Sequence, residues 1–176
     1  MSRRVRFAIS ILLLALAACS TNPPPPAPPQ AVVSPPPVAA APAPVRAQGL
    51  RPDLDAHWFG PDGKILYPPD DGFDAAPVHS TLQPGRLIDR FGGSGRYFSP
   101  KGEPFPARAL PSVCEIQIYT VYRVLKPLPV ASGKAVPWFD EPGGATQYET
   151  DEASDMLVAE HVLDPIPDPG PAPCSN

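Results

Sequence analysis

Apolar and polar positions alternate most clearly in residues 115–125, which read EIQIYTVYRVL. β-branched and aromatic residues favour strands, and successive side chains of a strand point to opposite faces. The alternation therefore predicts a strand whose more apolar face is formed by Ile116, Ile118, Thr120, Tyr122 and Val124. Thr120 is the polar member of that face, and a threonine satisfied within a sheet is its simplest interpretation.

Shorter runs of the same kind follow this strand. Residues 128–130 and 135–139 are rich in apolar side chains and flank Ser132 and Gly133. A Ser-Gly pair between two apolar runs predicts a hairpin or another tight return of the chain. Residues 143–148 begin with two glycines and lead into one more short strand.

One helix is expected in the domain. Residues 151–158 are acidic at their start and predict a short helix with Met156 and Leu157 facing inward. Together with the strands, this pattern predicts a β-rich α+β fold: a small mixed, mainly antiparallel sheet with long Gly/Pro-rich loops and few short helices. The single folded domain is expected to span residues 49–164, and loops of this length in a small domain usually carry function.

The segment that precedes these elements contains turn signals and no helical pattern. Asp62-Gly63 and Asp71-Gly72 are dipeptides that mark turns. Trp58 and Tyr67 are the large aromatic residues of this segment. We interpret both as aromatics at the edge of the core, because this position is more common for them than contact with a ligand.

Proline divides the chain into regions. Of the 30 prolines, eleven lie between Pro23 and Pro44, in a segment without any periodic apolar pattern. Proline fixes φ and removes an amide donor, so residues 19–48 are expected to form an extended, semi-rigid linker. Residues 165–176 are expected to form a second proline-rich segment, a tail behind the domain.

The N-terminus has the features of an export signal. Three arginines precede a short apolar run that ends in small residues, which predicts a signal peptide over residues 1–18. Its end, Leu-Ala-Ala-Cys, resembles the lipobox of bacterial lipoproteins, so Cys19 is the expected site of lipidation. We therefore expect an exported, membrane-anchored lipoprotein in the outer membrane or cell envelope. The alternative is secretion, with Cys19 incidental.

Charge and cysteine content narrow the functional classes. All 18 acidic residues lie beyond residue 52, so the domain is acidic and a poor candidate for nucleic acid. In an exported domain, Cys114 and Cys174 predict a disulfide that holds the C-terminus, and two unpaired thiols are the alternative. No metal site is expected, because the chain lacks CxxC and HxxxH spacing and its three histidines are scattered.

Residues 82–111 combine arginines, aromatic rings and glycines in one stretch. Glycine lets a backbone approach a ligand closely, arginine suits phosphate oxygens, and an aromatic face suits a flat ring. The stretch therefore predicts a ligand site, although an ordinary solvated loop has a similar composition. Its arginines are Arg86, Arg90, Arg96 and Arg108, and its aromatics are Phe91, Tyr97, Phe98 and Phe105.

An ordered set of motifs carries a family resemblance. The segments YPPDDGF, LIDRFGGSGRYFSP, ARALP, YTVYRVLKPLPV, PWF and GGATQY resemble the NAD glycohydrolase domain of the tuberculosis necrotizing toxin family. The resemblance implies hydrolysis of the nicotinamide-ribose bond of NAD or NADP, which are substrates, with no cofactor. It also implies a role as a toxin or effector domain, with an inhibitory immunity protein as partner.

The resemblance assigns roles to single residues. Arg90, Arg108 and Gln147 correspond to functional residues of the family and are the expected catalytic group. The expected substrate-binding residues are Phe91, Tyr97, Arg96 and Thr120. Thr120 stands where the toxin that names the family has a histidine. This departure favours the alternative function, a catalytically inactive envelope module that binds a ligand or a protein.

Overall fold

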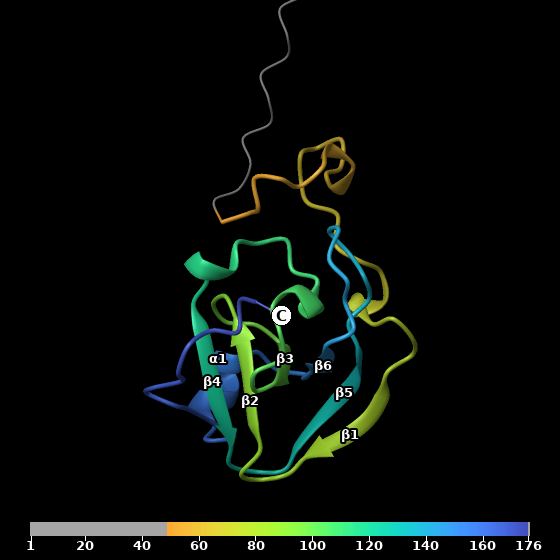
Figure 1. Ribbon diagram of the computed structural model, residues 1–176. Coiled ribbons are helices and arrows are strands. Elements are labelled where there is room, and N and C mark those ends of the chain that lie inside the picture. Colours follow the sequence, from red (N-terminus) through yellow and green to blue (C-terminus); the bar gives the residue numbers. More distant parts are fainter. Residues whose placement is uncertain (1–48, 176) are drawn as a thin grey trace, which may run out of the picture. The chain divides into compact units, whose positions relative to one another are not determined.

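The computed structural model describes residues 49–175, which form one seven-stranded sheet with short helical segments (Figure 1). The predictions for the signal peptide, for Cys19 and for the linker concern residues outside this range. The strands are β1 (Val78–Leu82), β2 (Leu87–Phe91), β3 (Tyr97–Pro100), β4 (Tyr119–Val124), β5 (Leu128–Lys134), β6 (Thr146–Glu149) and β7 (Leu163–Pro165). The helices are η1 (Ala56–Trp58), η2 (Asp70–Gly72), η3 (Pro106–Arg108), η4 (Cys114–Ile116) and α1 (Ser154–Ala159).

The strand order in the sheet is β1-β5-β6-β3-β2-β4-β7, and each of these neighbouring pairs is antiparallel. The predicted fold class, a β-rich α+β fold with a mainly antiparallel sheet and few short helices, is therefore confirmed. None of the helices in residues 49–175 is long and apolar enough to cross a membrane. In Figure 1 the long loops gather above one end of the strands.

The strand predicted for residues 115–125 is shorter in the structure. β4 begins at Tyr119, and the residues before it form the 3-10 turn η4 and an extended link. Its partner β2 ends at Phe91, where Gly92 adopts a φ of 86° and turns the chain away. Because residues before Tyr119 have no partner strand, Ile116 and Ile118 are exposed rather than part of an apolar face.

The predicted turn at Ser132 and Gly133 is wrong, because both residues lie inside β5. Ser132 pairs with Val78 of β1 on one side and with Tyr148 of β6 on the other. A Cβ atom added to Gly133 would lie 2.7 Å from the ring of Phe73. The glycine therefore makes room for a buried aromatic ring instead of a reversal of the chain.

The main core lies on the sheet face that α1 covers. Leu157 of α1 is buried there, whereas its neighbour Met156 is 50% exposed, so the inward orientation predicted for Met156 is wrong. Neighbouring helical residues are separated by about 100° around the axis, and a short helix cannot direct both inward. Leu157 packs with residues from all seven strands, Leu82, Ile88, Phe98, Tyr122, Val124, Leu128, Val130, Tyr148 and Leu163.

The opposite face of the sheet carries a smaller apolar cluster that holds the C-terminal tail. Cys114 and Cys174 form a disulfide, and Cys114 packs with Phe91 and Phe105. The backbone N–H of Phe105 donates to the carbonyl of Pro173 at 2.8 Å. The tail is therefore bound to the domain covalently and by hydrogen bonding near η3.

We predict that the disulfide contributes a large part of the stability. The cross-link closes a loop with a sequence separation of 60 residues. Loss of such a constraint in Cys174→Ser should lower the free energy of unfolding by about 4 kcal/mol. Chemical denaturation with and without dithiothreitol measures this effect, and a Cys114→Ser/Cys174→Ser double variant should not respond to the reductant. A change below about 1 kcal/mol would contradict the prediction.

We also predict that Gly133→Ala destabilises the domain by about 1–3 kcal/mol, because the new methyl group overlaps the buried Phe73 ring. Gly93→Ala is the matched control: no atom lies within 4 Å of a Cβ added at Gly93, and its φ is not in the left-handed range. Thermal unfolding of the two variants tests the difference. Equal melting temperatures would show that Phe73 moves aside without cost.

Candidate active site

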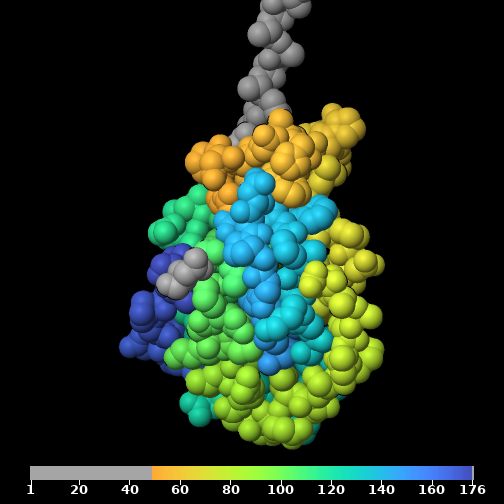
Figure 2. All heavy atoms as spheres, turned by 45° about the vertical axis from the view of Figure 1, so that its right-hand side comes forward, coloured from red at the N-terminus to blue at the C-terminus, as the bar shows by residue number. Residues whose placement is uncertain are grey.

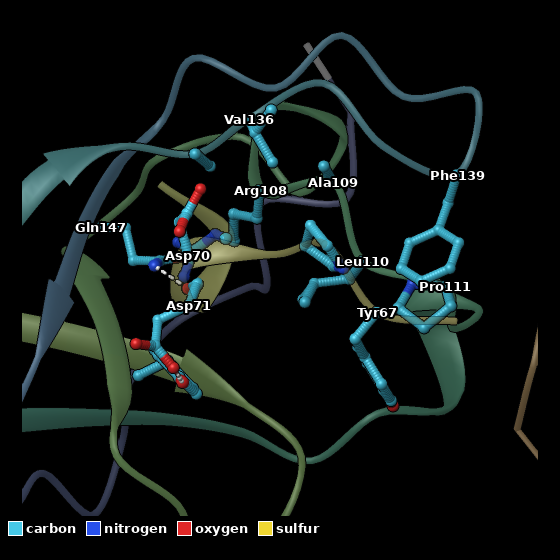
Figure 3. Close-up of a pocket in the computed structure, with 14 residues that line it drawn as sticks. Tyr67, Asp70, Asp71, Arg108, Ala109, Leu110, Pro111, Val136, Phe139 and Gln147 are labelled. Carbon is cyan, nitrogen blue, oxygen red and sulfur yellow. Dashed lines mark hydrogen bonds between the residues drawn. The ribbon is translucent and has the colours of Figure 1, made fainter. Parts of the chain in front are cut away.

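A cavity of about 620 Å³ opens where the long loops meet the sheet (Figure 3). Residues 67–72, 108–111 and 135–139 form its walls, and Tyr97 of β3 and Gln147 of β6 complete the lining. Sites for small molecules commonly have volumes of roughly 300–1,000 Å³. The cavity is therefore large enough for a ligand of dinucleotide size.

The two ends of the cavity differ in chemistry. Figure 3 shows Gln147, Asp70 and Asp71 close together at one end, and the rings of Tyr67 and Phe139 at the other. Apolar side chains of the 108–111 loop lie between them. A ligand that fills the cavity would contact hydrogen-bonding groups and carboxylates at one end and aromatic rings at the other.

The acidic wall is held by a buried ring. Phe73 is 5% exposed and packs against Gly133, and the Val136 N–H donates to the Gly72 carbonyl at 2.9 Å. These contacts fix the preceding turn, in which Asp70 and Asp71 have φ values of 52° and 53°. Left-handed backbone costs a non-glycine residue about 1–2 kcal/mol, so the surrounding packing has to hold the turn in place.

Gln147 is tied to this turn. Its Nε2 donates to the carbonyl oxygen of Asp71 at 2.8 Å, and the Tyr97 hydroxyl donates to the Asp71 carboxylate at 3.1 Å. No hydrogen bond from residues 49–175 reaches Gln147 Oε1, so this oxygen is available to a ligand. Burial, with the Glu149 carboxylate, raises the pKa of Tyr97, which keeps its hydroxyl proton near neutral pH.

Arg108 is largely buried and has protein partners of its own. Its Nη1 lies 2.6 Å from a carboxylate oxygen of Asp89, which is 0% exposed, and its Nε and Nη2 donate to the Glu103 carbonyl. Its guanidinium carbon lies 5.0 Å from the Phe91 ring centroid. The Tyr119 hydroxyl also donates to Asp89, and burial together with that bond raises the pKa of Tyr119. Arg108 therefore supports the fold as well as lining the cavity.

Arg90 borders a smaller cavity of about 140 Å³, which Gln147, Tyr97, Phe91 and Arg108 also line. Its Nε and Nη1 are buried and have no hydrogen-bond partner within residues 49–175. Its guanidinium carbon lies 5.7 Å from the Phe98 ring centroid, and burial lowers the pKa of Arg90. A cation with unused donors beside a cavity suits an anionic ligand.

Two of the expected substrate-binding residues, Arg96 and Thr120, line neither cavity. Arg96 donates to Glu149 at 2.7 Å and lines neither cavity. Thr120 is the register partner of Arg90 across β4 and β2, so the two side chains leave the sheet on the same face, the one that α1 covers, but only Arg90 borders a cavity. The structure thus brings Gln147, Tyr97, Phe91, Arg90 and Arg108 together, but it does not bring Arg96 and Thr120 to the same cavities.

Other lining residues were missed from the sequence. Tyr67 is 66% exposed in the cavity wall, so its interpretation as a core-edge aromatic is wrong. Asp70 and Asp71 are predicted only as part of the YPPDDGF segment, with Asp71-Gly72 as a turn signal, although doubled aspartates before a glycine are also a signal of unusual backbone. In residues 49–175, no group of three or more His, Cys, Asp and Glu side chains is arranged to hold a metal ion.

The fold and the cavity together describe a class of protein: a small, β-rich domain whose loops form a cavity of small-molecule size. Residues 81–166 match the model of the family described as Tuberculosis necrotizing toxin. This stretch is just under half of the chain and includes Arg90, Tyr97, Arg108 and Gln147. The match supports the family resemblance inferred from the motifs, and it leaves out the cavity wall formed by residues 67–72.

Individual proteins also resemble part of the chain. The conidial surface nicotinamide adenine dinucleotide glycohydrolase of Aspergillus fumigatus is 36% identical over 104 residues, which is 51% of this chain and 44% of that protein. This chain therefore spans less than half of that relative's length. The solved structure of tuberculosis necrotizing toxin with its immunity factor has a TM-score of 0.49 at 22% identity, covering 60% of this chain and 65% of the toxin. That of Tse6 with Tsi6 has a TM-score of 0.38 at 20% identity, covering 58% and 85%.

We predict that the buried Asp89–Arg108 ion pair contributes to the stability of the fold. Arg108→Met leaves a buried carboxylate without its cation, which should cost about 3–5 kcal/mol of unfolding free energy. An Asp89→Asn/Arg108→Met double variant should recover most of that loss, because no buried charge remains. Chemical denaturation measures both, with exposed Arg123→Met as a control. Purely additive losses would contradict the pairing.

Proposed function

We propose that the chain hydrolyses the nicotinamide-ribose bond of NAD or NADP and releases nicotinamide and ADP-ribose or its phosphate. The observation that carries the proposal is the 36% identity to an NAD glycohydrolase, combined with a cavity that contains Gln147. The family model supports it independently over residues 81–166. A role as a toxin or effector domain is part of the same proposal.

The leaving group explains why this site needs no strong general acid. Nicotinamide is a pyridinium in NAD, so it takes the electron pair of the broken C–N bond and leaves as a neutral molecule. The site has to hold the substrate, stabilise the cationic ribose and admit water. Water then bonds to the ribose carbon and loses a proton. A histidine at the position of Thr120 is therefore not required by the bond cleavage itself.

Gln147 and its neighbours suit the reacting end of the substrate. With Nε2 held by Asp71, the free Oε1 can accept from a ribose hydroxyl or from the attacking water. The carboxylates of Asp70 and Asp71 line the same end, where negative charge favours a cationic ribose. Arg90, with two unpaired nitrogens beside the smaller cavity, is the cation best placed for a phosphate.

The proposed setting is the cell envelope. Residues 1–18 as a signal peptide and Cys19 as a lipid site remain predictions from the sequence. The disulfide between Cys114 and Cys174 supports export, because such bonds persist mainly in oxidising compartments. The same proposal includes an inhibitory immunity protein as partner, which the family resemblance implies. An enzyme that can reach the NAD of its own cell needs such an inhibitor.

We predict that the purified chain releases nicotinamide from NAD or NADP and that Gln147→Ala lowers kcat by about 10²–10³-fold, because an oriented polar contact to the reacting centre is lost. Nicotinamide release followed by chromatography measures this rate. Gln83→Ala is the matched control, because Gln83 is exposed and donates only to the Thr81 carbonyl at 3.4 Å.

Two results would count against the function. Absence of nicotinamide release by a folded parent chain with an intact disulfide would favour the alternative, an inactive module that binds a ligand or a protein. Equal rates for Gln147→Ala and the parent would remove Gln147 from the mechanism. In that case the reacting ribose would have to lie elsewhere in the cavity.

A further inference from the structure

The end of the cavity opposite Gln147 is built from aromatic rings that the proposed chemistry does not use. Tyr67 lines this end with a ring that is 66% exposed, and it meets the buried ring of Phe139 edge to face at a centroid distance of 6.0 Å. A large exposed aromatic in a cavity wall is a common mark of a binding surface. The open face of such a ring suits a flat ligand group.

Two indole hydrogen bonds hold this aromatic end together. Trp138 Nε1 donates to the Leu66 carbonyl at 2.9 Å, and Trp58 Nε1 donates to the Asp140 carboxylate at 2.9 Å. The Trp58 ring also lies 5.1 Å from that of Trp138. Figure 2 shows the segment before residue 67, in orange, against the light-blue loop after β5. The residue next to Leu66, Tyr67, is thereby fixed at the rim rather than left on a free loop.

The backbone under this wall is strained. Phe139 has a φ of 55° and Asp140 a φ of 59°, in the region that glycine favours. A bulky aromatic residue with positive φ is a genuine outlier, and such residues persist where the surrounding structure fixes them, often at ligand sites. Phe139 is 1% exposed, so its ring backs the wall and leaves Tyr67 as the ring that faces the cavity.

We propose that Tyr67 is the stacking residue for the adenine ring of the dinucleotide. The inference rests on the proposed function, which places the nicotinamide ribose at the Gln147 end. The substrate has a second flat ring at its far end, and the far end of this cavity offers the exposed Tyr67 face. Tyr67 precedes residues 81–166, the stretch that matches the family model, and begins the YPPDDGF segment named among the motifs.

Binding of AMP tests the subsite without depending on catalysis. AMP carries the adenine ring and one phosphate but lacks the nicotinamide half. Isothermal titration calorimetry with the full chain should show that Tyr67→Ala weakens AMP binding by roughly 5- to 100-fold, the range expected when one stacked base loses its aromatic partner. Tyr67→Phe, which keeps the ring, should restore binding. Ile118→Ala, at an exposed apolar residue that does not line the cavity, should bind AMP like the parent.

Kinetics on NAD provide a second measurement. Loss of an adenine contact that is equal in the ground and transition states should raise KM in Tyr67→Ala by a factor similar to that for AMP, with kcat unchanged. Inhibition by free nicotinamide should keep its strength, because that ring binds at the other end. Melting temperatures of the variants show whether each is folded.

Each failure has its own signature. A parent chain that does not bind AMP, or a Tyr67→Ala variant that binds AMP as well as the parent, would overturn the adenine subsite even when NAD is cleaved. A fall in kcat with KM unchanged would place Tyr67 at the reacting end instead and would also overturn it. Absence of nicotinamide release would defeat the proposed function, while Tyr67-dependent AMP binding would still support the aromatic subsite.

Discussion

A carboxylate that is completely buried organises the face of the sheet that carries the site. Asp89 of β2 accepts hydrogen bonds from the Gly102 N–H and the Tyr119 hydroxyl, and it pairs with Arg108. A buried charge is tolerated only when partners compensate for its lost hydration. These partners come from β4, from the loop after β3 and from η3, so satisfying Asp89 fixes three segments at once. The cavity wall that follows η3 is positioned by this requirement.

The opposite wall depends on shape rather than charge. Gly133 leaves space in the middle of β5, and Phe73 fills that space with its ring. Phe73 follows the turn at Asp70 and Asp71, so the packing of its ring also fixes that turn. The Asp71 carbonyl of this turn accepts a hydrogen bond from Gln147. One wall is thus fixed by a buried ion pair and the other by a packed aromatic ring. The cavity lies between these two walls, in the space that the packed residues of neither wall fill.

The fold class can be predicted from the sequence, but only part of the site can. Alternation in residues 115–125 identifies β4, but the length of β4 is set by where Phe91 ends β2. Gly133 has the local signature of a turn, and only the distant Phe73 explains it as a strand residue. Motif resemblance assigns roles to Gln147, Tyr97 and Arg90. It includes Tyr67 and Asp71 only as part of the YPPDDGF segment, and their place in the cavity depends on contacts with the distant residues Phe139 and Tyr97.

Strain is concentrated around the cavity. Six non-glycine residues of the described chain have positive φ, and four of them, Asp70, Asp71, Ala109 and Phe139, line the cavity. Each such residue costs about 1–3 kcal/mol. This cost is offset by the Asp89–Arg108 pair, by the packing of the Phe73 ring and by the indole hydrogen bonds of Trp58 and Trp138. A wall held in this way cannot relax to fill the open volume. The cavity therefore remains open before a ligand arrives, and binding does not have to order its walls.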